Sequence, residues 1–163
     1  MFREMRRKKQ LLSQAETIEM LRTCTSGVLA VAGDEGYPYA VPLSFAYQDG
    51  KLFFHMAKDG HKLDGIARND KVSFCVIQQD QVMAQTFTTH YRSAIVFGRA
   101  RILTEDSEKR HALECLAQKY SPDFPEQAQA EIEMDWNRVL AVELAIEHMS
   151  GKAAIEQVTG KAE

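Results

Sequence analysis

The segment Tyr37–Tyr47 constrains the fold most, because the size of its side chains alternates with a period of two. Its odd positions carry large, mainly apolar residues, and its even positions carry proline, alanine or serine. This pattern predicts a β-strand whose large face is buried, as in the wall of a barrel. Pro38 and Pro42 lack backbone donors, so one edge of the strand cannot be fully paired. We expect either an ordinary edge strand or one whose small face lets a flat ligand approach the backbone.

The rest of the chain predicts a mainly β protein with peripheral helices. Short, hairpin-length links favour an antiparallel sheet, and glycine-rich corners favour a six-stranded barrel, with Gly98 at a bulge. Ser13 and Glu16 form a capping-box pattern, and Thr104 is the expected N-cap of a later helix. We expect one domain over 1–152 and a frayed tail over 153–163. The expected strands are 27–32, 37–47, 52–56, 71–79, 91–103 and 137–149. The expected helices are 13–23, 61–69, 108–120 and one that ends near 134. Residues 80–89 are expected to be irregular.

Composition excludes several classes of protein. The 163 residues carry a formal net charge of -3, which does not favour nucleic acid or an anionic membrane as a partner. The three cysteines form no C-x-x-C pair, which argues against a disulfide framework and a structural zinc site. Neither a secretory signal nor a membrane-spanning run is visible, so we expect a cytoplasmic protein. Residues 1–10 hold five basic residues, which form either a nucleic-acid contact or an arm that is solvated or docked on the body.

No nucleophile–base arrangement, phosphate loop or metal motif is recognisable. Residues 55–62 run from a strand end through a glycine loop to a helix start, where backbone N–H groups favour anions. His61 and Lys62 at this start either bind a phosphate or are exposed on a turn. His55 and His61 are not expected to bind metal, because no third ligand accompanies them. Arg92 and Ser93 either contact the same ligand or form an ordinary polar strand entry.

Several segments together resemble the pyridoxamine 5'-phosphate oxidase-like flavoproteins, and more narrowly their nitroimidazole-resistance branch. They are YPYAVPLS at 37–44, FHMAKDGHK at 54–62, FTTHYRS at 87–93 with FG at 97–98, GK at 151–152, and the opening MFREMRRK. The resemblance implies an FMN-binding split β-barrel, with FMN at the two-fold interface of a homodimer.

The resemblance also implies roles for individual residues. One strand of the family lays its backbone along the isoalloxazine ring, and a pair at the next strand end makes further contacts. A basic pair, usually Arg-Lys, binds the phosphate, and a polar residue on the long strand, often Gln, contacts the ring. Trp136 either reaches the partner's flavin or packs, and Arg138 alone near the end does not favour vitamin B6 oxidation. The matching cofactor-binding positions are Tyr39, Val41, Pro42, Leu43, Ser44, His55, Met56, His61, Lys62, Arg92 and Ser93.

Three functions follow as hypotheses. The first is an FMN-dependent reductase that passes electrons from NAD(P)H to a small acceptor such as a nitroaromatic; the flavin then carries the chemistry and no catalytic side chain is needed. The second is a non-catalytic flavin- or haem-binding protein, with His55, His61, His90 or His148 as the axial ligand. The third is a nucleic-acid-binding protein that uses the basic arm.

Overall fold

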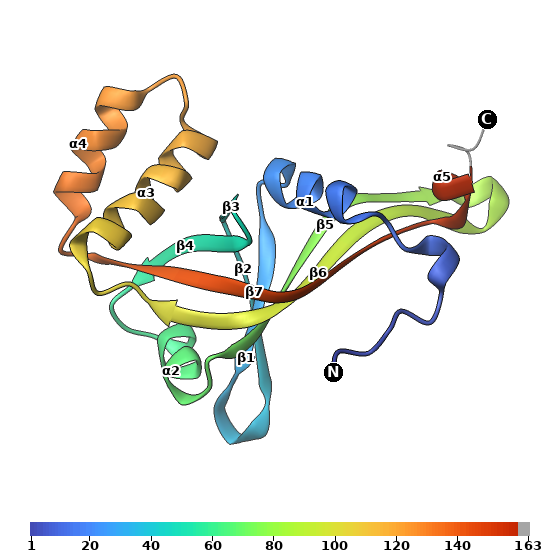
Figure 1. Cartoon of the computed structure of the whole chain (residues 1–163), viewed down its shortest axis with the longest axis horizontal. Helices are drawn as coiled ribbons and strands as arrows, with labels where there is room; N and C mark the ends of the chain where they lie inside the picture. Colours follow the sequence, from blue (N-terminus) through green and yellow to red (C-terminus); the bar gives the residue numbers. More distant parts are fainter. Residues whose placement is uncertain (160–163) are drawn as a thin grey trace.

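The computed structural model describes residues 1–159, which form one antiparallel sheet with helices around it (Figure 1). The strand order is β2-β1-β5-β6-β7-β4-β3, and every neighbouring pair is antiparallel. The strands are β1 (Gly27–Ala32), β2 (Pro38–Leu43), β3 (Ala46–Gln48), β4 (Lys51–Ala57), β5 (Lys71–Met83), β6 (Thr88–Ile102) and β7 (Val139–Ala153). The helices are α1 (Gln14–Thr23), α2 (His61–Arg68), α3 (Asp106–Tyr120), α4 (Pro125–Asp135) and α5 (Ile155–Thr159).

The sheet has seven strands and does not close, which corrects the prediction of a six-stranded barrel. The predicted strand 37–47 is interrupted after Leu43, and its two halves, β2 and β3, lie at opposite edges of the sheet. Phe45 lies in the interruption and is fully buried, and its backbone N–H donates to the Tyr120 hydroxyl at 2.9 Å. Within residues 1–159, β2 and β3 are each hydrogen-bonded to a neighbouring strand on one side and to none on the other. We call the unpaired edges of these two strands the seam.

Large apolar side chains fill the inner face of the sheet. Phe45, Phe54 and Phe74 are buried there, together with Met20 and Leu21 of α1. A second, smaller core lies under the α3–α4 hairpin, which packs at one end of the molecule (Figure 1). Its members are Ala46, Phe53, Leu103, Ala112, Leu113, Leu116, Ile132 and Ala141.

Local signals in the sequence are confirmed where short-range geometry decides them. Ser13 and Glu16 form the expected capping box, and the register of β6 against β7 shifts at Gly98. A Cβ at Gly98 would lie 2.2 Å from the Ala145 carbonyl oxygen, so only glycine lets β7 approach there. The predicted N-cap at Thr104 is wrong: α3 is preceded by Glu105, without a side-chain cap.

Two segments are more regular than predicted. Residues 80–83 and 88–89, expected to be irregular, belong to β5 and β6, so these strands form a long hairpin that extends beyond the body (Figure 1). The last strand runs to Ala153, and Ile155–Thr159 follow as α5, so regular structure continues past the expected end at 152. The final residues of the predicted frayed tail, 160–163, lie outside the described residues. No helix of the described part is long and apolar enough to cross a bilayer.

Candidate functional site

A link of three residues joins β4 to α2, and no side chain of residues 1–159 caps the start of this helix. Gly60 precedes the helix at φ +112°, a left-handed conformation that favours glycine. Within residues 1–159 the N–H groups of Leu63 and Asp64 donate to the Gly60 carbonyl oxygen, which leaves the N–H groups of His61 and Lys62 for an anion. Gly65 lets the helix lie close to β1, because a Cβ there would be 2.5 Å from Val31 Cγ2. The sequence therefore leaves the start of α2 without a side-chain cap and fixes the helix against the sheet.

The two basic residues at this end are in different situations. Lys62 is half-buried and makes no ion pair within residues 1–159. His61 stacks on Tyr39 of β2, with ring centroids 4.0 Å apart. Its buried Nε2 lies 3.5 Å from Asp34 Oδ2, too far for a hydrogen bond, and has no hydrogen-bond partner within residues 1–159, while Asp34 pairs with Arg68 at 2.9 Å. Lys62 is therefore the better placed of the two to meet a phosphate, and His61 fixes α2 against β2.

Strand β2 has the two faces that the sequence predicts. Tyr39, Val41 and Leu43 are partly buried and pack against the core. The small residues of the other face are exposed, and so is Ser44 beyond the strand. Only one edge of β2 is paired, with β1, so the strand presents an open backbone at the seam. The exposed small residues of the strand are Pro38, Ala40 and Pro42.

The two predicted residues at the end of β4 differ in exposure. His55 is exposed, whereas Met56 is 5% exposed and belongs to the core. A ligand at this strand end would therefore contact the His55 side chain but only the backbone of Met56. The short link from β4 to α2 brings this pair near Lys62.

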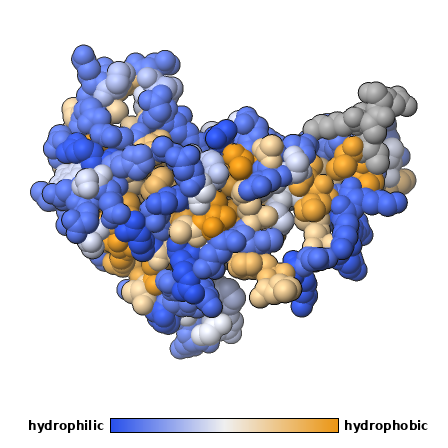
Figure 2. All heavy atoms as spheres, in the orientation of Figure 1, coloured by the Kyte–Doolittle hydropathy of each residue, from blue (hydrophilic) through white to orange (hydrophobic). Residues whose placement is uncertain are grey.

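The small face of β2 continues into an outer sheet face that α3 and α4 leave uncovered. Cross-strand pairing places Pro42, Val28, Cys75 and Ile95 in one row across four strands. Val28 and Ile95 are 37% and 43% exposed, and Figure 2 shows hydrophobic residues at the surface between the α3–α4 end and the N-terminal arm. This row was not predicted from the sequence, although side chains alternate between the two faces of the sheet over 27–32 and 93–97.

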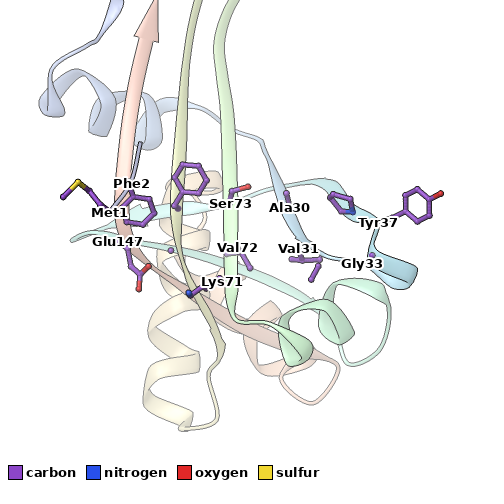
Figure 3. A pocket seen from close by; sticks show the side chains of 15 residues that line it. Met1, Phe2, Ala30, Val31, Gly33, Tyr37, Lys71, Val72, Ser73 and Glu147 are labelled. Atoms are coloured by element: carbon purple, nitrogen blue, oxygen red, sulfur yellow. The ribbon is translucent and has the colours of Figure 1, made fainter. Parts of the chain in front are cut away.

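A groove of about 680 Å³ lies on this outer face. It runs from Phe2 across Ser73 and Ala30 to Tyr37 at the β1–β2 turn (Figure 3). Phe2 stacks on His148, with ring centroids 4.8 Å apart, so the start of the chain forms one wall of the groove.

The structure does not bring Arg92 and Ser93 to the other predicted residues within one subunit. Ser93 lies on β6, three strands from β2, which corresponds to roughly 14 Å at the usual strand spacing. Arg92 donates to Gln78 Oε1 at 3.0 Å and lies 3.6 Å from Glu16. A ligand at the seam would meet these two residues only if a second subunit supplied them.

Trp136 packs against residues of its own chain. The ammonium group of Lys109 lies 4.6 Å from the centroid of its ring and donates to its carbonyl oxygen at 2.6 Å, and the guanidinium of Arg110 lies 5.0 Å from the ring. Of the two interpretations of Trp136, these contacts favour packing.

Solved structures share this fold at low sequence identity. A candidate 5-nitroimidazole antibiotic resistance protein from Bacteroides thetaiotaomicron is 23% identical, with a TM-score of 0.74 over 88% of this chain and 86% of that one. An FAD-binding protein from Mesorhizobium loti is 24% identical (TM-score 0.67; 89% and 97% covered). An FAD- and haem-binding protein from Mycobacterium smegmatis is 22% identical (TM-score 0.73; 95% and 80% covered). No curated protein matches the sequence.

The sequence matches the family model described as pyridoxamine 5'-phosphate oxidase over residues 13–153. This match includes the whole sheet, α2 and the seam. The chain therefore belongs to the pyridoxamine 5'-phosphate oxidase family, whose split-barrel fold it shares.

Proposed function

We propose that this protein is an FMN-dependent oxidoreductase that works as a homodimer and passes electrons from NAD(P)H to a small acceptor such as a nitroaromatic. The observation that carries the proposal is the uncapped N-terminus of α2, with Lys62 on its first turn, beside the unpaired edge of β2.

The residues present fit FMN in chemical character. A phosphate suits free N–H groups at a helix N-terminus together with a lysine ammonium group. A flat ring suits a strand that exposes backbone and small side chains, as β2 does through Ala40 and Pro42. His55 and Ser44 add exposed polar groups on either side of the seam. The flavin relatives from Mesorhizobium loti and Mycobacterium smegmatis support a flavin as the ligand class.

A second copy of the chain is the occupant that we propose for the outer face. The exposed apolar side chains there include Val28, Ile77, Ile95 and Phe97, and contiguous exposed apolar surface of this kind marks an interface. Dimerisation through this face would also supply Ser93 to the partner's seam, whereas Arg92 lies on the opposite face of β6, beside Glu16 of α1.

Bound FMN would supply the hydride and electron chemistry, and the protein would supply binding and orientation. Lys62 and the α2 N–H groups would hold the phosphate. β2 would orient the ring, and the partner subunit would exclude water from it. No acid or base is required from the side chains for these tasks.

The decisive test is an FMN titration of wild type and Lys62→Ala, followed by flavin absorbance. Loss of one charge-assisted contact predicts at least tenfold weaker binding, about 1.5 kcal/mol or more. Lys58→Ala, in the exposed loop before α2, should leave the affinity unchanged. If Lys62→Ala binds FMN as tightly as wild type, the phosphate assignment is wrong.

The absorption spectrum tests the redox assignment. A two-band flavin spectrum that bleaches on addition of NADH or NADPH would support a reductase. A Soret band would favour the haem-binding alternative, and retention of FMN without bleaching would favour a non-catalytic flavoprotein.

A further inference from the structure

The basic N-terminal arm is docked on the body at its end, while its basic side chains are exposed. The backbone N–H of Leu12 donates to the Gly151 carbonyl oxygen at 3.0 Å, and Leu11 forms an isolated antiparallel bridge with Lys152. Gln10 is 7% exposed, and its Oε1 accepts a hydrogen bond from the Tyr91 hydroxyl at 3.3 Å. The end of the arm is therefore held beside β6 and β7.

The arm concentrates positive charge that the described residues leave unpaired. Within residues 1–159, Arg6, Arg7 and Lys9 make no ion pair, and neither does Lys152 on β7. Glu4 is the sole acid among the first ten residues, and it pairs with Lys8 at 2.7 Å. On the body, by contrast, six arginines have carboxylate partners: Arg68, Arg92, Arg99, Arg101, Arg110 and Arg138.

Two adjoining hollows expose these charges. Arg6 and Arg7 line both of them. The first hollow, of about 560 Å³, extends to Ile155 of α5, and the second, of about 430 Å³, extends to Tyr91 and Lys152. The ammonium group of Lys152 lies 5.2 Å from the centroid of the Tyr91 ring, so this ring helps to fix the lysine beside the two arginines. The second hollow is therefore a recess with three cations and an aromatic ring on its walls.

The recess is also connected to the outer sheet face. Lys152 is the cross-strand partner of Ser93, which we propose meets the flavin of the partner subunit. A ligand that extends from the flavin site along β6 and β7 would therefore reach Arg6 and Arg7 with its far end. Guanidinium groups bind phosphate oxygens in a bidentate manner, and a tyrosine ring can stack on a base.

We propose that Arg6, Arg7 and Lys152 bind a phosphate group of a dinucleotide whose redox end lies at the flavin site, an inference that rests on the proposed function. Two dinucleotides offer such a group: NADPH through its 2'-phosphate, and FAD through the pyrophosphate and adenylate that FMN lacks.

The test measures binding by calorimetry in the full-length, FMN-loaded protein, so it does not depend on turnover. The probes are 2',5'-ADP, which carries the 2'-phosphate, and 5'-AMP, which lacks it. For the second source, FAD and FMN are compared on flavin-free protein. We expect wild type to bind either 2',5'-ADP at least tenfold more tightly than 5'-AMP, or FAD at least tenfold more tightly than FMN. The double substitution Arg6→Gln/Arg7→Gln should abolish that preference. Arg138→Gln, which changes an arginine paired with Asp135, is the charge-matched control and should retain it.

Preference for 2',5'-ADP would assign the recess to NADPH, and preference for FAD over FMN would assign it to the flavin dinucleotide. Equal binding within both pairs, or a preference that survives the double substitution, would overturn the inference. Salt-sensitive binding of duplex DNA, lost in the double variant without any nucleotide preference, would overturn it in favour of a nucleic-acid contact. FMN binding through Lys62 would be unaffected in all these cases, so failure here is distinct from failure of the proposed function.

Discussion

The two faces of the β1-β5-β6-β7 sheet differ in what covers them. On neighbouring strands, Phe74 points to the inner face and is 1% exposed, whereas Phe97 points to the outer face and is 40% exposed. The inner face is complete within one subunit. The outer face is covered by α3 and α4 at one end and is open at the other. The inner face therefore determines most of the stability of the chain, and the open part of the outer face is the part for which we propose a partner.

Alanine substitution of these two phenylalanines tests the comparison directly. Phe74→Ala leaves a cavity in a closed core and should cost about 3–5 kcal/mol of unfolding free energy. Phe97→Ala removes a half-exposed ring and should cost about 1 kcal/mol in the isolated subunit. Urea unfolding at several protein concentrations measures both. Equal losses at high dilution would show that the outer face is as much a part of the subunit core as the inner face.

A charge on the open part of the outer face tests its proposed partner. Ile95→Arg should leave the subunit folded but weaken the dimer by about 3–5 kcal/mol, because the charge would be buried without a partner. Light scattering after size exclusion measures the mass, and far-UV circular dichroism checks the fold. Met134→Arg on α4, where Met134 is 68% exposed, is the control and should remain dimeric. A dimeric Ile95→Arg protein would place the interface elsewhere.

The sequence predicts what local geometry decides. The two faces of β2 and the capping box at Ser13 depend on residues a few positions apart, and the structure confirms both. The break at Phe45 was not predictable in this way, because Tyr120, which holds its backbone, lies 75 residues away. The extension of β5 and β6 into 80–90 depends on cross-strand pairing rather than on an apolar pattern.

The candidate site shows the same division. Lys62 at a helix start is a local feature, and the structure places it there. The stacking of His61 on Tyr39 joins α2 to β2, and no local sequence pattern predicts this contact. The outer-face row across β2, β1, β5 and β6 likewise exists only once the strands are paired.

The contact of α2 with β1 couples the closed inner side to the candidate site. Gly65→Ala would place a methyl group 2.9 Å from the Ala32 carbonyl oxygen and against Val31, so it should cost about 2 kcal/mol by overpacking. Because α2 must shift, FMN affinity should also fall. Ala67→Gly, at an exposed position of the same helix, should cost about 1 kcal/mol and leave the affinity unchanged. A destabilised Gly65→Ala protein with wild-type FMN affinity would separate the helix position from the site.

The covered end of the outer face contains a nearly buried carboxylate, Glu143, which receives hydrogen bonds from Lys51 at 2.8 Å and Arg101 at 3.0 Å. Burial alone raises the pKa of Glu143, but these two hydrogen bonds more than offset that effect and hold its pKa below the usual range. A carboxyl group with a lowered folded-state pKa stabilises the protein above its unfolded pKa, and this contribution is lost as the pH falls through the folded value.

Glu143→Gln should therefore cost about 1 kcal/mol at pH 7, since both cations are half-exposed and screened by solvent. The deficit should shrink as the pH falls below about 4, the ordinary pKa of a glutamate in the unfolded chain, and should disappear once the folded carboxyl group is protonated as well. Thermal unfolding of both proteins from pH 7 to pH 3 measures the difference. Glu147→Gln, at a more exposed carboxylate paired with Arg99, should show a smaller deficit. A deficit for Glu143→Gln that is the same at pH 7 and pH 3 would mean that shape, and not charge, keeps this end of the outer face closed.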